Sequence, residues 1–361
     1  MKTGSVPLVS IVTPVYNEAE HLAECIESVL GQTYQNWDYT IVNNCSTDGS
    51  LQVARRYAAK DRRIRVHDNQ QFLRVIANHN VALRQVSPSS KYCKVVFGDD
   101  WIFPECLERM VAVAEKHPSV GIVGAYAMEG QQVMWTGLTY PSELTSGHEI
   151  CRRRFLENVY VFGTATSLLF RADLVRSRDP FYNESNLHAD SEACVVLLKE
   201  CDFGFVHQVL TFTRVRPMSL TSMTWDLNTL LAGELCELVA HGREFLTKDE
   251  YERCVDQHLS KYYRFLAGSV LRCRDRKFWN YHKGKLIAAG LKLDRFRLAR
   301  ATLARLVSAL LNLEHTFDRL RSVHSVVRLR HKLSVSRIAS EIWKGRLLRH
   351  AKEKEGRIQI R

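Results

Sequence analysis

The chain has 361 residues, of which 45% are hydrophobic and 25% charged, as in an ordinary globular protein of about two domains. It contains no run of about 18 apolar residues, which excludes a transmembrane helix, and its N-terminus has no apolar signal-peptide core. None of the ten cysteines forms a C-x-x-C pair. This pattern disfavours a zinc site and indicates reduced thiols in a cytosolic protein.

The net charge of +12 is concentrated near the C-terminus. Residues 1–290 contain 33 basic and 33 acidic side chains, whereas residues 291–361 contain 18 basic and 6 acidic ones. This segment therefore accounts for the whole excess. The asymmetry indicates a neutral globular body and a basic C-terminal segment whose partner is an anionic surface.

Short β-branched runs alternate with amphipathic segments of about ten residues over the first third of the chain. The expected strands are residues 8–13, 37–42, 64–67, 92–97 and 120–125, and the expected helices are residues 19–30, 51–59, 76–86 and 104–116. Strands that alternate with helices of this length predict a parallel sheet built from βαβ units.

The remainder of the chain changes character twice. Residues 130–165 are expected to be irregular, and they precede two strands and a helix at residues 168–171, 205–214 and 191–199. Long amphipathic patterns then follow at residues 227–246, 249–272, 278–289 and several times between 295 and 352. We therefore expect a sheet domain over residues 1–225 and a helical, basic region over residues 226–361.

Polar residues follow three of the predicted strands. They are Asp99 and Asp100 after the fourth strand, Asn43 and Asn44 after the second, and residues 14–18 after the first. Ligands of open α/β sheets bind beyond the carboxyl ends of the strands. Two adjacent carboxylates there would suit Mg²⁺ or Mn²⁺ carrying a diphosphate, because these cations prefer oxygen ligands. The alternative is a turn that continues into a helix N-cap, for which Asp is also favoured.

Five segments resemble motifs of the family 2 glycosyltransferases with the GT-A fold. They are residues 9–18 (VSIVTPVYNE), 26–33, 44–50 (NCSTDGS), 98–100 (GDD), which is similar to the D-x-D-type element, and 188–192 (HADSE), which is similar to the later acidic motif. The resemblance covers roughly residues 7–220. It implies an α/β fold of the GT-A (Rossmann-like) type, with a mostly parallel sheet flanked by helices, to which the C-terminal α-helical region is added.

The resemblance further implies a site for a nucleotide-diphosphate sugar and a metal. Asp100 would hold Mn²⁺ or Mg²⁺, with Asp99 sharing the metal or lying nearer the ribose, and the cation would stabilise the departing diphosphate. The residues that match donor-binding positions are Pro14, Tyr16, Asn17, Glu18, Asn44, Arg74, Asp99, Arg214 and Arg216. For Arg74 the alternative is a solvated surface arginine.

An inverting transferase also needs a carboxylate that removes the proton of the acceptor hydroxyl. Asp190, at the start of a predicted helix, is the candidate base, and Glu192 is the alternative. Both acids would also be favoured at a helix N-terminus by the helix dipole alone. Gly163 and Thr164 match an acceptor-side glycine loop of the family, and the alternative for them is a tight entry into a strand.

Departures from the family pattern refine this prediction. Asn44 stands where the family often has an Asp that accepts a hydrogen bond from uracil, and since an Asn amide both accepts and donates, the base stays open. Arg216 stands where a His is frequent, which leaves a third metal ligand open but supplies a cation for phosphate. The Q-x-x-R-W motif of processive synthases is absent from the sequence, so transfer of one sugar per binding event is expected.

We therefore expect an inverting, non-processive glycosyltransferase of the hexosyl or N-acetylhexosaminyl type. Its acceptor would be a hydroxyl of a glycan or a lipid-linked glycan, as in the synthesis of cell-surface polysaccharide or lipopolysaccharide. One alternative is a nucleotidyltransferase acting on sugar phosphates, although residues 14–18 lack the Gly-rich basic loop expected of it. The other is a non-catalytic, membrane-associated nucleotide-binding scaffold, against which the intact Asp99, Asp100 and Asp190 argue.

The basic C-terminal segment has two interpretations. Residues 298–313, 326–333 and 338–350 are basic and amphipathic, and such segments can lie on an anionic membrane, with about 1 kcal/mol for each basic residue near the surface. Alternatively they form a helical bundle that packs on the catalytic domain. The protein is thus expected to be cytoplasmic, with a peripheral position on the inner face of the cell membrane under the first interpretation. Nucleic acid is not an expected partner, because no recognisable binding module occurs.

Overall fold

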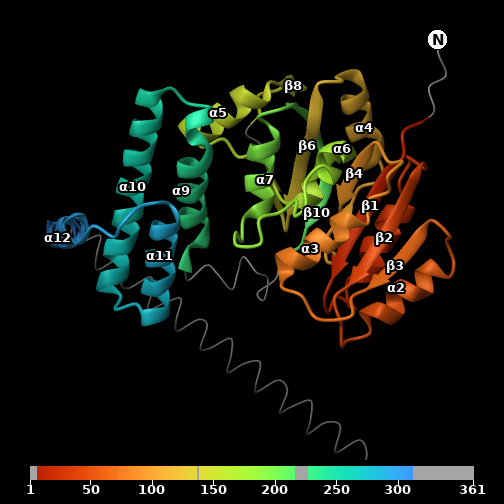
Figure 1. Cartoon of the computed structure of the whole chain (residues 1–361), viewed down its shortest axis with the longest axis horizontal. Coiled ribbons are helices and arrows are strands. Elements are labelled where there is room, and N and C mark those ends of the chain that lie inside the picture. The colour runs from red at the N-terminus through yellow and green to blue at the C-terminus, as the bar shows by residue number, and fades with distance from the viewer. Residues whose placement is uncertain (1–5, 136–137, 216–226, 312–361) are drawn as a thin grey trace, which may run out of the picture. The chain divides into compact units, whose positions relative to one another are not determined.

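The computed structural model describes residues 6–135, 138–215 and 227–311 (Figure 1). Arg216 and the basic segments at residues 326–333 and 338–350 lie outside the described residues. The chain divides into two compact units. The first comprises residues 1–262 and 275–293, and the second comprises residues 263–274 and 294–361.

A ten-stranded sheet forms the centre of the first unit within the described ranges (Figure 1). Its spatial order is β3-β2-β1-β4-β9-β6-β10-β5, with β7 added to β6 and β8 added to β10. The strands are β1 (Val9–Val15), β2 (Trp37–Asn43), β3 (Ile64–Asp68), β4 (Tyr92–Val95), β5 (Trp101–Ile102), β6 (Val120–Glu129), β7 (Gln132–Met134), β8 (Leu144–Thr145), β9 (Leu168–Arg171) and β10 (Asp202–Thr213).

Most of this sheet is parallel, as predicted. The pairs β1–β2, β1–β4, β2–β3 and β6–β10 are parallel, and β9 lies antiparallel between β4 and β6. The six strands β1, β2, β3, β4, β6 and β10 therefore point the same way, and their carboxyl ends reach the same edge. The expected α/β architecture is thus confirmed.

Helices cover both faces of the sheet. Along β1, Val9 and Ile11 pack into one core cluster and Val12 into the other, because successive side chains of a strand point to opposite faces. Burial on both faces explains why the parallel strands are continuous apolar runs. One cluster includes helices α1 (Leu22–Leu30), α2 (Ser50–Ala58) and α4 (Cys106–Lys116), and the other includes α3 (Val75–Arg84), α6 (Ala172–Arg176) and α7 (Ala189–Leu197).

Residues 130–165 are more regular than their sequence suggested. They contain β7, β8 and the eleven-residue helix α5 (Gly147–Glu157). The hydroxyl oxygen of Ser146 caps α5 by accepting a hydrogen bond from the Glu149 backbone N–H over 3.1 Å. The expectation of an irregular segment was therefore wrong for this part of the chain. Only a narrow face of α5 is buried, through Ile150, Cys151 and Arg154, so the sequence of this helix has a weak apolar pattern.

The helical pattern of the C-terminal region is confirmed as far as the structure describes it. The helices are α9 (Thr229–His241), α10 (Lys248–Leu271), α11 (Arg276–Ala288) and α12 (Arg295–Leu311). Helices α9 and α11 belong to the same compact unit as the sheet, whereas α12 belongs to the second unit. Across the described ranges, each helix is too short or too polar to cross a membrane.

Candidate active site

Asp100 lies just beyond β4, and only 2% of its surface is exposed. Each oxygen of its carboxylate accepts a hydrogen bond from a different segment. The Thr166 hydroxyl donates to Oδ2 over 2.7 Å, and the Arg214 backbone N–H donates to Oδ1 over 3.0 Å. A buried carboxylate requires such partners. Asp100 therefore joins the loop after β4 to the turn before β9 and to the end of β10.

A buried lysine fixes the position of the segment that contains Thr166. Lys94, within β4, is fully buried, and its Nζ donates to the backbone carbonyls of Thr166 over 2.5 Å and of Leu168 over 3.1 Å. Burial lowers the pKa of Lys94, as expected for an ammonium group taken out of water. Thr166 is thus held through its carbonyl by Lys94 and through its hydroxyl by Asp100.

The side chain of Arg214 also makes contacts close to Asp100. Its Nε donates to the carbonyl of Asp99 over 3.1 Å, and its Nη2 donates to Glu24 of α1 over 2.5 Å. The guanidinium also lies over the ring of Trp101, 5.3 Å from the ring centroid. The predicted phosphate-binding arginine therefore lies beside the predicted metal ligands, where it pairs with a carboxylate of the protein.

The turn after β1 lies against the same loop. The Glu18 side chain lies beside Gly98, which directly precedes Asp99. Asn17 has a backbone φ of 55°, and its side-chain oxygen accepts a hydrogen bond from the Thr47 N–H over 2.8 Å. Pro14 is buried at the end of β1, where it pairs with Val42 of β2, and the exposed Tyr16 makes an edge contact with Phe72 at a ring-centroid distance of 4.9 Å.

Asn44 is almost fully buried, and its amide is paired with a neighbouring loop. Its Nδ2 donates to the Leu73 carbonyl over 2.8 Å, and its Oδ1 accepts from the Leu73 N–H over 2.9 Å and from Asn69 over 3.1 Å. An Asp could not donate to the Leu73 carbonyl. This pairing gives a physical reason for Asn at this position, and it places Phe72 opposite Tyr16. The adjacent Arg74 is exposed at the start of α3.

Gly163 and Thr164 precede the turn that contains Thr166. Gly163 has a φ of +68°, and a Cβ at this position would lie 3.0 Å from Nε1 of Trp135, so both the backbone conformation and the space favour glycine. The Thr164 hydroxyl lies 3.5 Å from that of Thr213 at the end of β10. The loop is thus adjacent to the strand end that carries Arg214.

Asp190 lies on a different element, in the first turn of α7. Its Oδ1 accepts a hydrogen bond from the Ser191 N–H over 2.9 Å. Burial raises the pKa of the Asp190 carboxyl, although this hydrogen bond and the nearby His188 imidazole act in the opposite direction. A carboxylate with a raised pKa is a stronger base than an exposed one, which suits it to proton abstraction.

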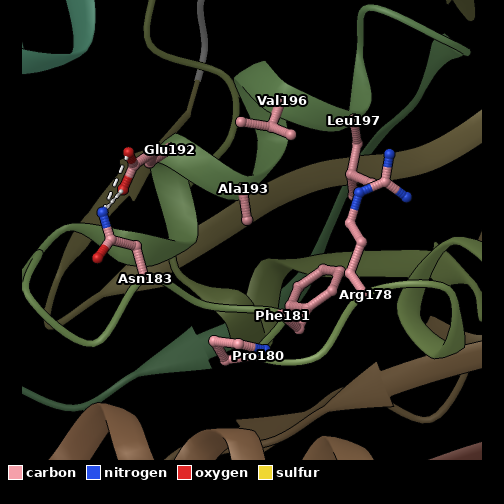
Figure 2. Close-up of a pocket in the computed structure, with 8 residues that line it drawn as sticks. All are labelled: Arg178, Pro180, Phe181, Asn183, Glu192, Ala193, Val196 and Leu197. Carbon is pink, nitrogen blue, oxygen red and sulfur yellow. Dashed lines mark hydrogen bonds between the residues drawn. The ribbon is translucent and has the colours of Figure 1, made fainter. Parts of the chain in front are cut away.

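Glu192 is the alternative candidate for the base. It lines a pocket of about 330 Å³ beside α7, together with Arg178 and several apolar side chains (Figure 2). Hydrogen bonds from Asn186 (2.8 Å) and Asn183 (3.1 Å) hold its carboxylate. Burial by itself raises the pKa of Glu192, but the nearby His241 and these two amides lower it overall. Glu192 is therefore a weaker base than Asp190, and its oxygens are already oriented by the protein.

Aromatic rings link the surroundings of Asp190 to the Asp99–Asp100 loop. Phe97, directly before this loop, stacks on His79 at a centroid distance of 4.9 Å, and His79 contacts Tyr182 edge-on at 6.4 Å. Burial lowers the pKa of His79 to about 4, so this ring is neutral near pH 7. Burial and the charge of Asp190 raise the pKa of Tyr182.

The carboxylates present fit a metal that is completed by its substrate. Within the described ranges no three side chains of His, Cys, Asp or Glu converge as metal ligands. Mg²⁺ is commonly held by one or two carboxylates, with phosphate oxygens and water as its other ligands. The adjacent Asp99 and Asp100, beside Arg214, match that donor set better than a metal site made of protein ligands alone.

Two residues close to Asp100, Thr166 and Lys94, were not predicted from the sequence to belong to the site. Thr166 is part of the glycine loop that the sequence indicated, but only the structure shows its bond to Asp100. Lys94 had a detectable signal, because a lysine in the middle of an apolar strand must find buried partners. The partners are backbone carbonyls, which carry no sequence signature.

A mostly parallel α/β sheet with acidic and basic residues gathered beyond its strand ends defines a protein of the nucleotide-binding α/β class. Residues 10–177 match the sequence model of the family "Glycosyl transferase family 2". Over this segment, which is slightly less than half of the chain, the sequence is similar to glycosyl transferase family 2.

Curated relatives agree with this assignment. The chain is 30% identical over 237 residues to "Uncharacterized glycosyltransferase EpsJ" of Bacillus subtilis (strain 168), an alignment that covers 61% of this chain and 64% of EpsJ. It is also 30% identical over 118 residues to "Glycosyltransferase GlyA" of Streptococcus pneumoniae serotype 4, which covers 33% of this chain and 16% of GlyA. For the first four curated relatives that match, the chain spans 13% to 60% of their length.

The fold is shared with a solved crystal structure. The crystal structure of TarS residues 1–349 from S. aureus in complex with UDP-GlcNAc matches with a TM-score of 0.60 at 17% identity, over 82% of this chain and 87% of that one. At this level of identity the comparison shows the fold, which is that of the GT-A glycosyltransferases.

Proposed function

We propose that the protein is an inverting, non-processive glycosyltransferase that transfers one sugar from a nucleotide-diphosphate donor to a hydroxyl of a glycan or a lipid-linked glycan. The observation that carries this proposal is the convergence of Asp99, Asp100, Thr166 and Arg214 at the strand ends of a domain similar to family 2. This corner combines carboxylates that suit a metal with a cation that suits a diphosphate.

In this proposal, Asp100 and Asp99 would hold Mn²⁺ or Mg²⁺, which when bound would supply Lewis-acid stabilisation of the departing diphosphate. Arg214 exchanges Glu24 for a phosphate oxygen of the donor. The nucleoside lies near the turn at residues 14–18, where Tyr16 and Phe72 expose their rings to a base. Asn44 contributes by fixing the loop that carries Phe72.

Asp190 acts as the general base in this scheme. It accepts the proton of the acceptor hydroxyl while that oxygen attacks the anomeric carbon and the bond to the diphosphate breaks. Its position on α7, separate in sequence from the donor-binding loops, suits an attack from the side opposite the leaving group. Gly163 and Thr164 border the acceptor side.

The donor can be identified by thermal stabilisation. We expect at least one member of a panel of UDP-, GDP- and dTDP-sugars to raise Tm by about 5 °C at a hundredfold excess over Kd, in the presence of Mn²⁺ and not of EDTA. That donor should then release nucleoside diphosphate when an acceptor is supplied. Stabilisation by none of these sugars contradicts the proposal. Release of pyrophosphate from a nucleoside triphosphate and a sugar phosphate would favour a nucleotidyltransferase instead.

A second part of the proposal concerns the basic helix α12. Its residues Leu303, Leu306, Val307 and Leu310 follow the i, i+3, i+4, i+7 spacing of one helix face, and all four are exposed. Four arginines lie in the same helix, at positions 295, 297, 300 and 305. An exposed apolar face accompanied by arginines is complementary to an anionic membrane surface, so we propose that α12 binds the inner face of the cell membrane.

Vesicle flotation tests this membrane contact. The full chain should bind vesicles that contain 30% phosphatidylglycerol in phosphatidylcholine, and the double change Leu303→Asp, Leu310→Asp should weaken binding at least about tenfold, since each leucine buries apolar surface. Binding should also weaken at 0.5 M salt. The matched control is Ile287→Asp in α11, which changes another exposed apolar residue and should leave binding unchanged. Equal binding by the double variant and the wild type contradicts the proposal.

A further inference from the structure

The first turn of α7 rests on a buried ion pair contributed by two other helices. Arg154 of α5 and Glu237 of α9 pair through Nε and Oε1 over 2.7 Å, and their side chains are only 8% and 5% exposed. Arg154 also lies over the rings of Tyr160 and Phe162, at 5.3 and 5.4 Å from their centroids. A pair this deeply buried is stable only if its remaining hydrogen-bonding positions are filled.

Ser191 fills two of those positions. Its hydroxyl accepts a hydrogen bond from Nη2 of Arg154 over 2.8 Å and donates to Oε2 of Glu237 over 3.0 Å. The backbone N–H of the same Ser191 donates to Asp190 over 2.9 Å. Ser191 thus connects the ion pair to the candidate base. Its hydroxyl contacts Arg154 and Glu237, and its backbone N–H contacts Asp190.

Helix α9 makes a second contact with this turn, through His188. A Cβ on Gly233 would lie 2.8 Å from Cδ2 of His188, so only glycine allows the helix to approach this closely. The Nε2 of His188 lies 3.2 Å from the Thr229 hydroxyl. His188 and Ser191, which lie on either side of Ala189 and Asp190 in the sequence, therefore both contact α9.

We infer that Arg154 and Glu237 are positioning residues, which hold Ser191 and thereby orient the Asp190 carboxylate for proton transfer. This inference rests on the proposed role of Asp190 as the general base. It assigns a function to α9 that lies outside the segment matched by the family, because residues 229–241 follow the matched residues 10–177.

The electrostatic surroundings of Asp190 determine which variant tests the inference most cleanly. The titratable and charged groups around this turn are His188, Tyr182, Cys194, Arg154, Glu234 and Glu237. Replacing Arg154 or Glu237 changes the local charge and leaves the other partner buried without its counterion. Ser191→Ala keeps every charge and the ion pair itself, and it removes only the hydroxyl that connects them to the turn.

The decisive measurement is a ¹³C NMR titration of the Asp190 carboxyl, assigned by its loss in the Asp190→Asn variant. In Ser191→Ala we expect the midpoint to rise by about half a pH unit, because the N–H that favours the ionised form is no longer held in place. Ser191→Thr keeps the hydroxyl and should restore the wild-type midpoint. An unchanged midpoint in Ser191→Ala overturns the inference.

A second measurement uses amide exchange at Ser191 and a pair of matched variants. Glu237→Gln should accelerate exchange about tenfold, whereas Glu234→Gln should not. Glu234 is a partly buried carboxylate on the same helix, but it accepts a hydrogen bond from Tyr160 over 2.6 Å. Equal exchange in the two variants would also overturn the inference.

Both measurements are made without a donor, so their outcomes do not depend on the proposed transferase activity. With the donor that the sugar-nucleotide panel identifies, Ser191→Ala should lower kcat about tenfold while KM for the donor stays within about twofold. Full turnover by Asp190→Asn would remove the proposed base role and leave the titration result intact. Loss of turnover in Asp190→Asn together with wild-type turnover in Ser191→Ala would remove only the positioning role.

Discussion

Replacing Asp190 by Asn should lower kcat about 10³-fold and leave Kd for the donor within about twofold of the wild-type value. A general base contributes typically 10²–10⁴-fold, and the Asn amide cannot accept the proton. Single-turnover transfer and a binding titration of the same preparation measure the two quantities. If donor binding is lost along with turnover, Asp190 belongs to the donor site and the assignment as base is wrong.

Glu192→Gln is the matched control for this substitution. Glu192 lies two residues further along α7 and its carboxylate is held by Asn183 and Asn186, so turnover should fall by less than about threefold. If Glu192→Gln abolishes transfer and Asp190→Asn does not, then Glu192 is the general base and Asp190 is not.

The raised pKa of Asp190 adds a dependence on pH with a definite sign. Because the base must be ionised, turnover should rise with pH through a value above the ordinary carboxyl pKa of 3.8. The folded state holds this proton more tightly than the unfolded state does. The carboxyl therefore contributes most to stability below about pH 4, and it loses that contribution as the pH rises through the folded pKa. The Tm of Asp190→Asn relative to wild type should thus increase between pH 4 and pH 7.

Replacing Asp100 by Asn should abolish the Mn²⁺-dependent rise in Tm with the donor and should lower turnover by roughly 10²–10³-fold. Asn has one acceptor oxygen, whereas two donors, the Thr166 hydroxyl and the Arg214 N–H, point at the two oxygens of Asp100. We also expect a loss of stability of about 1–3 kcal/mol, because one buried donor then faces an amide N–H₂. Donor titrations with and without Mn²⁺, followed by differential scanning fluorimetry, check both effects.

The matched control is Asp38→Asn in β2. Asp38 also accepts a hydrogen bond from a hydroxyl, that of Ser10, over 2.7 Å, but it lies near the start of its strand, away from the carboxyl edge. The Mn²⁺-dependent stabilisation should persist in this variant. Wild-type metal dependence in Asp100→Asn would show that Asp100 does not hold the cation.

The sequence predicted the order and type of most elements of the sheet domain. Strand β9 was placed at residues 168–171, as observed, and helix α3 was expected at residues 76–86 and found at Val75–Arg84. Strand β9 is a short continuous apolar run and α3 has a helical apolar period, and both are local properties of the sequence. The two-residue strand β5 was missed, because its pairing with β10 is a long-range contact without a local pattern.

Helix α5 was missed although it had a local signal. Ser146-Gly147-His148-Glu149 is an S-x-x-E capping sequence, and the Ser146 cap is present. Residues 152–154 are three consecutive arginines, which weaken the apolar pattern of the helix. Arg154 is nevertheless buried, because Glu237, 83 residues further along the chain, neutralises it.

The sequence by itself determined the α/β class of this protein and the family motifs at the strand ends, because strand and helix periods and short polar turns are encoded locally. The tertiary structure decided which side chains occupy the buried corner around Asp100 and which helix supports Asp190. Lys94, Thr166 and Glu237 reach their partners across 72, 66 and 83 residues. Contacts of this kind depend on how the sheet and the helices pack, and burial then makes each charge require the particular partner that it finds.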